Sequence, residues 1–169
     1  KHRINKANHL LKIYIFLILP FSYLVNFIFI PKITSLDKLD KKNFTNKSLD
    51  FLLQYYGSDK ANKVFDQYSK PIKRKKELIK GHGYSIFYEK YLYEYKDKDC
   101  DLLELGSFNG NAAAAFYFYL NKSSIYAGDI FPDIFRYKSN RIKIFYIDCS
   151  SEISINEKII DNNLSYNII

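Results

Sequence analysis

The sequence contains no methionine and no tryptophan, and it has only two cysteines, Cys100 and Cys149. Because methionine is missing even at position 1, we expect that Lys1 is not the native start of the protein. The cysteine spacing suits neither a zinc site nor a disulfide framework. No cluster of His and Cys, and no arrangement of Ser, His and Asp, supports metal or nucleophilic chemistry, so no metal site is predicted. A reducing cytosol is the default compartment.

Internal repeats are also absent, and the composition excludes a disordered chain. Of the 169 residues, 47% are apolar and 18% are aromatic, which is enough for one domain with a core. The formal net charge is +8, and basic residues concentrate between Lys70 and Lys80. Such clusters can bind nucleic acid. Lysine-rich runs are more often solvated loops, however, and the same charge suits an anionic membrane surface, so nucleic acid is the less favoured partner.

What the sequence does contain is a strand that leads into a glycine turn and then a helix. Residues Asp101 to Gly110 read Asp-Leu-Leu-Glu-Leu-Gly-Ser-Phe-Asn-Gly, and the apolar run is typical of a parallel strand covered on both faces. Gly106 and Gly110 bracket the turn, where glycine lets a ligand approach the backbone. Ala112 to Ala115 predict a helix packed close to the sheet, with its free N–H groups directed at whatever lies over the turn.

Two further strands are predicted downstream, and each ends at an acidic residue. Ser124 to Ile130 carries Asp129, where a doubly wound fold places the carboxylate that accepts ribose hydroxyls. The next strand, Ile142 to Asp148, ends at Asp148. This series predicts an α/β fold with a Rossmann-like parallel sheet and right-handed crossovers, preceded by N-terminal helices, one of them at 49–56.

The glycine spacing does not fit the Gly-x-Gly-x-x-Gly pattern of dinucleotide-binding proteins, because Phe108 and Asn111 stand at the second and third glycine positions. It fits Glu-x-Gly-x-x-x-Gly, and here the chain resembles the class I S-adenosylmethionine (SAM) dependent methyltransferases. The resemblance implies that SAM is the cofactor and that the loop passes under its methionine end. Phe108 stands where the family often has a glycine, which would reshape that pocket. The implied cofactor residues are, in the loop, Glu104, Gly106, Ser107, Phe108, Asn109 and Gly110, and at the strand ends Asp129 for the ribose and Asp148 for the adenine side.

Stretches upstream resemble a narrower group. Tyr56-Gly57-Ser58-Asp59-Lys60, and His82-Gly83-Tyr84 followed by Tyr88-Glu89, are similar to the lead-in of the macrolide-sugar O-methyltransferases. In that group such stretches help to close the cofactor site, which implies cofactor roles for Asp59 and His82. The resemblance runs from Tyr56 to Ile169 and implies methyl transfer to a hydroxyl oxygen of a sugar, a glycan or another small-molecule acceptor. The acceptor and metal-binding residues of the group lie further on, so no catalytic residue is named.

Each of these residues also has an interpretation without a ligand. The glycines can form a tight turn, Asp148 can cap a helix, and His82 can be an ordinary loop histidine. Glu104 lies inside a buried strand and needs a partner, because an unpaired buried carboxylate is costly; a backbone amide or Lys60 could be that partner. Two other functions stay open: a noncatalytic membrane-bound scaffold with a Rossmann-like fold, and a nicotinamide-dependent oxidoreductase, which the glycine spacing disfavours.

The end of the chain predicts an incomplete methyltransferase core. Ser165 to Ile169 reads as the opening of a fourth strand, whereas the core of the family has more strands than four. We therefore expect the N-terminal part of a longer enzyme, inactive by itself. Its predicted parts are a hydrophobic segment at 1–32, a helical lead-in with a basic loop at 33–98, and a SAM-binding domain at 99–169.

Residues Leu10 to Ile30 are nearly all apolar, and their number approaches the about 20 that span a bilayer. Pro20 divides them into two pieces that are each too short to span. Basic residues flank both sides, which favours a re-entrant or interfacial element with both ends in the cytosol. The predicted location is cytoplasmic, attached to the inner face of the membrane. The alternatives are a cleaved signal peptide, disfavoured because no small-residue cleavage site follows, and a soluble helical hairpin.

Tyr84 to Tyr95 places aromatic and apolar residues at helical spacing. Core packing over the sheet explains this pattern better than base stacking does. We therefore expect a helix whose aromatic face is buried.

Overall fold

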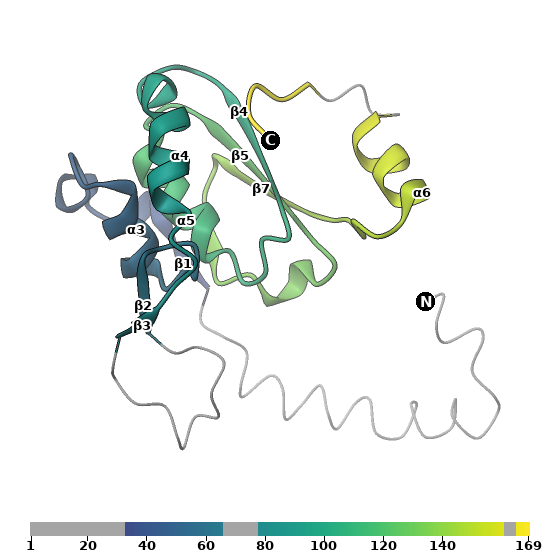
Figure 1. The fold of residues 1–169 in the computed structure, drawn as a ribbon. Helices are drawn as coiled ribbons and strands as arrows, with labels where there is room; N and C mark the ends of the chain where they lie inside the picture. The colour runs from purple at the N-terminus through teal and green to yellow at the C-terminus, as the bar shows by residue number, and fades with distance from the viewer. Residues whose placement is uncertain (1–32, 66–77, 161–164) are drawn as a thin grey trace. The chain divides into compact units, whose positions relative to one another are not determined.

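The computed structural model describes residues 33–65, 78–160 and 165–169, which belong to one compact unit. At its centre is a parallel sheet of three strands in the order β4-β5-β7 (Figure 1). The strands are β4 (Asp101–Leu105), β5 (Ser124–Asp129) and β7 (Ile142–Tyr146). Parallel pairing places the C-terminal ends of all three strands at one edge, which is where doubly wound sheets bind their ligands. The predicted α/β fold with a Rossmann-like sheet is confirmed.

The two connections between these strands differ. α5 (Asn111–Tyr119) joins β4 to β5, and all of its residues are buried. Between β5 and β7 the chain forms a 3-10 turn, Pro132–Ile134, and the short strand β6 (Tyr137–Lys138). β6 pairs in parallel with β1 (Thr34–Ser35), so this connection is tied to the beginning of the described chain.

The last described segment lies beside β4. Ile168 forms a parallel bridge with Leu102, and the Leu103 N–H donates to the Ile168 carbonyl at 2.9 Å. Because β5 occupies one edge of β4, this bridge extends the sheet at the other edge. The segment predicted to open a fourth strand therefore joins the sheet, through a single bridge. Between β7 and this segment lies α6 (Glu152–Ile155), which continues into a π-helical turn at Asn156–Ile160.

The lead-in at 33–98 is not only helical, as predicted, but also contains strands. Its helices are α3 (Leu49–Tyr56) and α4 (Ser85–Leu92), and β2 (Lys63–Phe65) and β3 (Leu78–Lys80) form an antiparallel pair between them. The prediction missed β1, β2 and β3 because two or three residues are too few to show the alternation of a strand. Further 3-10 turns lie at Leu36–Lys38, Lys41–Asn43 and Tyr93–Tyr95.

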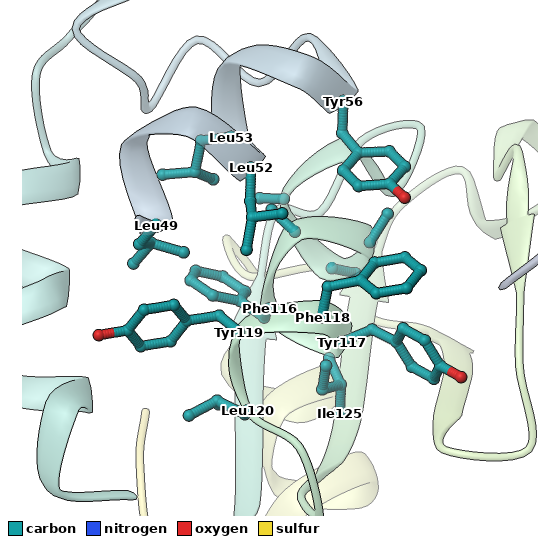
Figure 2. Packing of buried hydrophobic residues seen from close by; sticks show 14 of the residues in the cluster. Leu49, Leu52, Leu53, Tyr56, Phe116, Tyr117, Phe118, Tyr119, Leu120 and Ile125 are labelled. Carbon is teal, nitrogen blue, oxygen red and sulfur yellow. The ribbon is translucent and has the colours of Figure 1, made fainter. Parts of the chain in front are cut away.

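The main hydrophobic core lies between α3 and α5 (Figure 2). α3 begins where the Ser48 hydroxyl accepts a hydrogen bond from the Phe51 N–H, and it ends at Gly57, whose φ is 74°. The Tyr56 ring stacks on Phe118 of α5 with 5.7 Å between the centroids. The residues that α3 buries follow one face of a helix and are Leu49, Leu52, Leu53 and Tyr56. This packing fixes α3 and the turn that follows it against α5, the helix that leads out of the glycine turn.

The aromatic segment 84–95 is largely exposed, so the predicted burial of its aromatic face is wrong. In α4 only Ser85 and Leu92 are buried, and Tyr88 is partly buried against the core. α4 packs on α3 through this one face, and no described element covers the other. Four residues of the segment are 64–70% exposed, namely Ile86, Phe87, Tyr91 and Tyr93.

The predicted membrane segment at 10–30 and most of the basic run lie outside the described residues, in 1–32 and 66–77. Among the helices that are described, none is long and apolar enough to cross a bilayer.

Candidate functional site

The turn between β4 and α5 is held against β5 by backbone hydrogen bonds. The N–H groups of Gly106 and Ser107 both donate to the carbonyl of Gly128, at 2.9 and 3.1 Å. Within the turn, the Ser107 hydroxyl donates to the Glu104 carbonyl at 3.1 Å, and the Gly110 N–H donates to the Ser107 carbonyl at 2.9 Å. The turn therefore has a fixed shape at the C-terminal end of the sheet and at the start of α5.

The two glycines of the turn are required for different reasons. Both have a left-handed φ, 75° at Gly106 and 82° at Gly110. A Cβ on Gly106 would meet no atom within 4 Å, whereas a Cβ on Gly110 would lie 2.6 Å from the ring of Phe135. Phe135 is only 5% exposed. Only Gly106 therefore faces open space into which a ligand could fit, and Gly110 makes room for a core residue.

Asp129 ends β5 and is buried, with 7% of its surface exposed. Its Oδ2 accepts a hydrogen bond from the Phe108 N–H at 2.6 Å, and its Oδ1 accepts one from the Phe131 N–H at 2.9 Å. The carboxylate thus joins the middle of the glycine turn to the end of β5. Each oxygen keeps a further lone pair that could accept a ligand hydroxyl, and the predicted ribose contact stays a prediction.

Glu104 has the ionic partner that its burial requires. Its side chain is 6% exposed, and Lys60 Nζ lies 3.1 Å from Oε1. Burial raises the pKa of Glu104 above its ordinary value, although the charge of Lys60 acts in the opposite direction. Burial lowers the pKa of Lys60, but the ion pair with Glu104 outweighs this effect, so the pKa of Lys60 is raised. The pair links the lead-in to β4 beneath the glycine turn.

A second contact brings the lead-in to the turn. Nδ2 of Asn111, the first residue of α5, donates to the Gly57 carbonyl at 2.9 Å. Gly57 is the residue that ends α3, so the segment after α3 begins next to the start of α5. This segment, 58–62, contains the predicted Asp59.

Asp50 of α3 and the loop that precedes α4 hold the other side of segment 58–62. Oδ1 of Asp50 accepts hydrogen bonds from the Asn62 N–H at 2.8 Å and from the Ser85 hydroxyl at 2.6 Å. The His82 N–H donates to the Asp59 carbonyl at 2.7 Å, and His82 Nε2 lies 3.6 Å from Asp59 Oδ2. The two stretches of the lead-in that resemble the methyltransferases are thus in direct contact.

A polar cavity of about 250 Å³ opens between the glycine turn and segment 58–62. The lead-in and the Rossmann-like part each supply one side of it. The first two residues of α5, Asn111 and Ala112, also reach it. The lining residues are Ser58, Asp59, Lys60, Gly106, Ser107, Phe108, Asn109, Asn111 and Ala112.

The structure brings most of the predicted cofactor residues to this cavity, but not all of them. Glu104, Gly110 and Asp129 lie directly behind the lining residues through the contacts given above. His82 does not line the cavity; it pairs with Asp59 and stacks on Tyr84 with 5.3 Å between the ring centroids. The predicted residues that line the cavity are Asp59, Gly106, Ser107, Phe108 and Asn109.

Asp148 belongs to a separate turn. Its Oδ1 accepts hydrogen bonds from the Ser150 N–H at 2.9 Å and from the Ser150 hydroxyl at 2.6 Å. These bonds lower the pKa of Asp148. The side chain is engaged in its own turn and is not part of the cavity.

Sequence reasoning did not assign Ser58, Lys60, Asn111 or Ala112 to the site. Asn111 had a usable signal, since it is a polar residue at the start of a helix that is otherwise alanine and aromatic. Ser58 and Lys60 also had one, since they flank Asp59 in the stretch that resembles the methyltransferases. Ala112 had none, because its place depends on contacts between segments far apart in the sequence.

A larger apolar cavity of about 420 Å³ lies on the other side of the Lys60 and Glu104 pair. Its walls come from α4, α5, β4 and the last two residues, including Tyr91, Phe116 and Ile169. Lys60 lines both cavities. Across the described ranges, no group of three or more His, Cys, Asp or Glu side chains is placed to hold a metal ion.

Comparisons with known proteins give a likeness of fold. No family model matches the chain, and neither does any curated protein. Among solved structures, it is similar to the MycE methyltransferase from the mycinamycin biosynthetic pathway in complex with Mg and SAH, with a TM-score of 0.48 and 16% identity over 66% of this chain and 26% of that one. It is also similar to the same methyltransferase in complex with Mg, SAH and mycinamycin VI, with a TM-score of 0.44 and 17% identity over 62% and 25%.

The chain thus matches only about a quarter of the length of these neighbours.

Proposed function

We propose that residues 33–169 carry the SAM site of a methyltransferase that transfers the methyl group to a hydroxyl oxygen of a sugar or another small molecule. The observation that carries the proposal is the polar cavity, in which Gly106 faces open space and segment 58–62 meets the start of α5. A glycine whose Cβ position is empty lets a ligand lie against the backbone.

The residues present fit the methionine end of SAM. The start of α5, whose helix dipole attracts an anion, would hold its carboxylate, and Asp59 would hold its ammonium group. The volume of about 250 Å³ is below the roughly 300–1,000 Å³ of complete ligand sites, so the cavity suits one end of the cofactor. Asp129, at the end of β5, would hold the ribose.

When bound, the cofactor supplies a methyl group on a sulfonium, and transfer to oxygen needs an in-line approach and a base for the hydroxyl proton. The residues described here would bind and orient the cofactor. We assign none of them as the base. The sugar or small-molecule acceptor is supported by the resemblance of residues 56–60 and 82–89 to the macrolide-sugar O-methyltransferases.

Calorimetric titration of the purified chain with SAM tests the proposal. We expect SAM to bind and Gly106→Ala to weaken that binding at least tenfold, because the new Cβ fills space that the ligand would occupy. Gly83→Ala is the matched control, since Gly83 has a similar φ of 71° but does not line the cavity. Both variants carry a similar backbone strain of about 1–2 kcal/mol, so only the ligand-facing position should affect SAM affinity.

Two outcomes would contradict the proposal. If the chain binds a nicotinamide dinucleotide and not SAM, the oxidoreductase is the better account. If it binds neither, the Rossmann-like fold serves as a scaffold.

A further inference from the structure

Phe108 adopts a backbone conformation that is costly for its residue type. Its φ is 49°, and among the described residues only one other non-glycine, Asn46, has a positive φ. Asparagine tolerates this left-handed region, whereas a bulky residue is strained there. The Phe108 N–H donates to Asp129 Oδ2 at 2.6 Å, and this charge-assisted bond holds the strained residue in place.

Core packing does not explain the position of the Phe108 ring. The residue is 51% exposed, and it lines the polar cavity together with Asp59 and Lys60. No aromatic pair within residues 33–65, 78–160 and 165–169 involves it. Strained residues that line a cavity are typical of binding sites.

The charges around this ring favour a cationic ligand. Besides Glu104, two carboxylates lie at or directly behind the cavity, those of Asp59 and Asp129. The only lysine or arginine among the lining residues is Lys60, and it is paired with Glu104. The face of an aromatic ring attracts a cation through its quadrupole.

We infer that Phe108 is a specificity-determining residue whose ring contacts the sulfonium of SAM and so distinguishes SAM from S-adenosylhomocysteine (SAH). This inference rests on the proposed function. SAM and SAH share their adenosine and amino-acid ends and differ at sulfur, which is positively charged only in SAM. A contact made to that charge therefore strengthens binding of the substrate form and lets the product form leave.

The test is calorimetric titration of the chain and three variants with SAM and with SAH. Phe108→Leu keeps an apolar side chain without the ring, and Phe108→Gly removes both the ring and the backbone strain. Both should weaken SAM binding about two- to thirtyfold, the range of a cation–π contact, and leave SAH binding nearly unchanged. Phe108→Gly should also unfold at a temperature no lower than the wild type, which shows that lost binding is not lost folding.

Phe131→Leu is the matched control. The Phe131 N–H donates to the other oxygen of Asp129, and its side chain is 60% exposed, but it does not line the cavity. Its ratio of SAM to SAH affinity should equal that of the wild type.

Three results would overturn the inference. Equal loss of SAM and SAH affinity would show that the ring stacks on the shared adenosine part. Unchanged affinity for both would show that the ring touches no cofactor. A wild-type chain that binds neither SAM nor SAH would remove the proposed function, and this inference with it.

Discussion

Gly106 and Gly110 show how two residues of one motif can be required by different neighbours. Their φ values are nearly the same, but one Cβ position is empty and the other is occupied by the ring of Phe135. The sequence pattern assigns both glycines to ligand approach. What distinguishes them is Phe135, 25 residues after Gly110, whose ring packs against Gly110 and leaves the Cβ position of Gly106 open.

Gly110→Ala should therefore destabilise the fold. Strain at a φ of 82° and overpacking against Phe135 should together lower the free energy of unfolding by about 2–4 kcal/mol. Gly106→Ala carries only the strain and should lose about 1–2 kcal/mol. Urea unfolding of both variants measures the difference.

A double variant separates the two causes at Gly110. Adding Phe135→Leu to Gly110→Ala should recover part of the loss, because the smaller side chain leaves room for the new Cβ. Equal losses for the two glycine variants, with no coupling to Phe135, would mean that Gly110 does not pack as described.

At the scale of elements, α5 is a helix buried on all sides that nevertheless contains two tyrosines. The Tyr117 hydroxyl donates to Asp37 Oδ1 at 2.9 Å, whereas the Tyr119 hydroxyl is buried without a partner among the described residues. Burial raises the pKa of Tyr119 to about 12. We therefore expect replacement by phenylalanine to change the stability in opposite directions at the two tyrosines.

Tyr119→Phe should keep or raise the stability of the protein, by about 1 kcal/mol, because it removes an unsatisfied buried hydroxyl. Tyr117→Phe breaks a hydrogen bond and should lower the stability by about 0.5–1.5 kcal/mol. Thermal unfolding near pH 7 distinguishes the two variants. A clear loss in Tyr119→Phe would mean that its hydroxyl has a partner.

Tyr119 should also make the stability of the fold depend on pH. Its pKa in the folded protein lies above the ordinary value of 10, so between pH 10 and about 12 the unfolded chain releases this proton while the folded protein keeps it. The contribution of the protonated Tyr119 side chain to the free energy of unfolding is fully present below pH 10, and it is lost as the pH rises from 10 to about 12. Tyr119→Phe should therefore unfold less readily than the wild type at pH 11.

At the scale of the molecule, the sequence predicts the sheet well and its surroundings less well. β4, the turn, α5 and β5 are encoded in continuous local patterns of leucine, glycine and alanine. β1 becomes a strand only because it pairs with β6, about a hundred residues away. The exposure of α4 likewise depends on what packs beside it. Local patterns therefore locate the glycine turn and indicate Lys60 as a possible partner of Glu104, but they do not predict the contact of Asn111 with Gly57 that completes the cavity.

The central claim is that the cavity between the glycine turn and segment 58–62 holds SAM. Nuclear magnetic resonance of the ¹⁵N-labelled chain during a SAM titration tests it most directly, because each backbone amide reports its own surroundings. We expect saturable shifts that concentrate at residues 58–60, 106–112 and 129. Spectra that do not change at high SAM concentration, or shifts confined to the apolar cavity around Tyr91, Phe116 and Ile169, would contradict it.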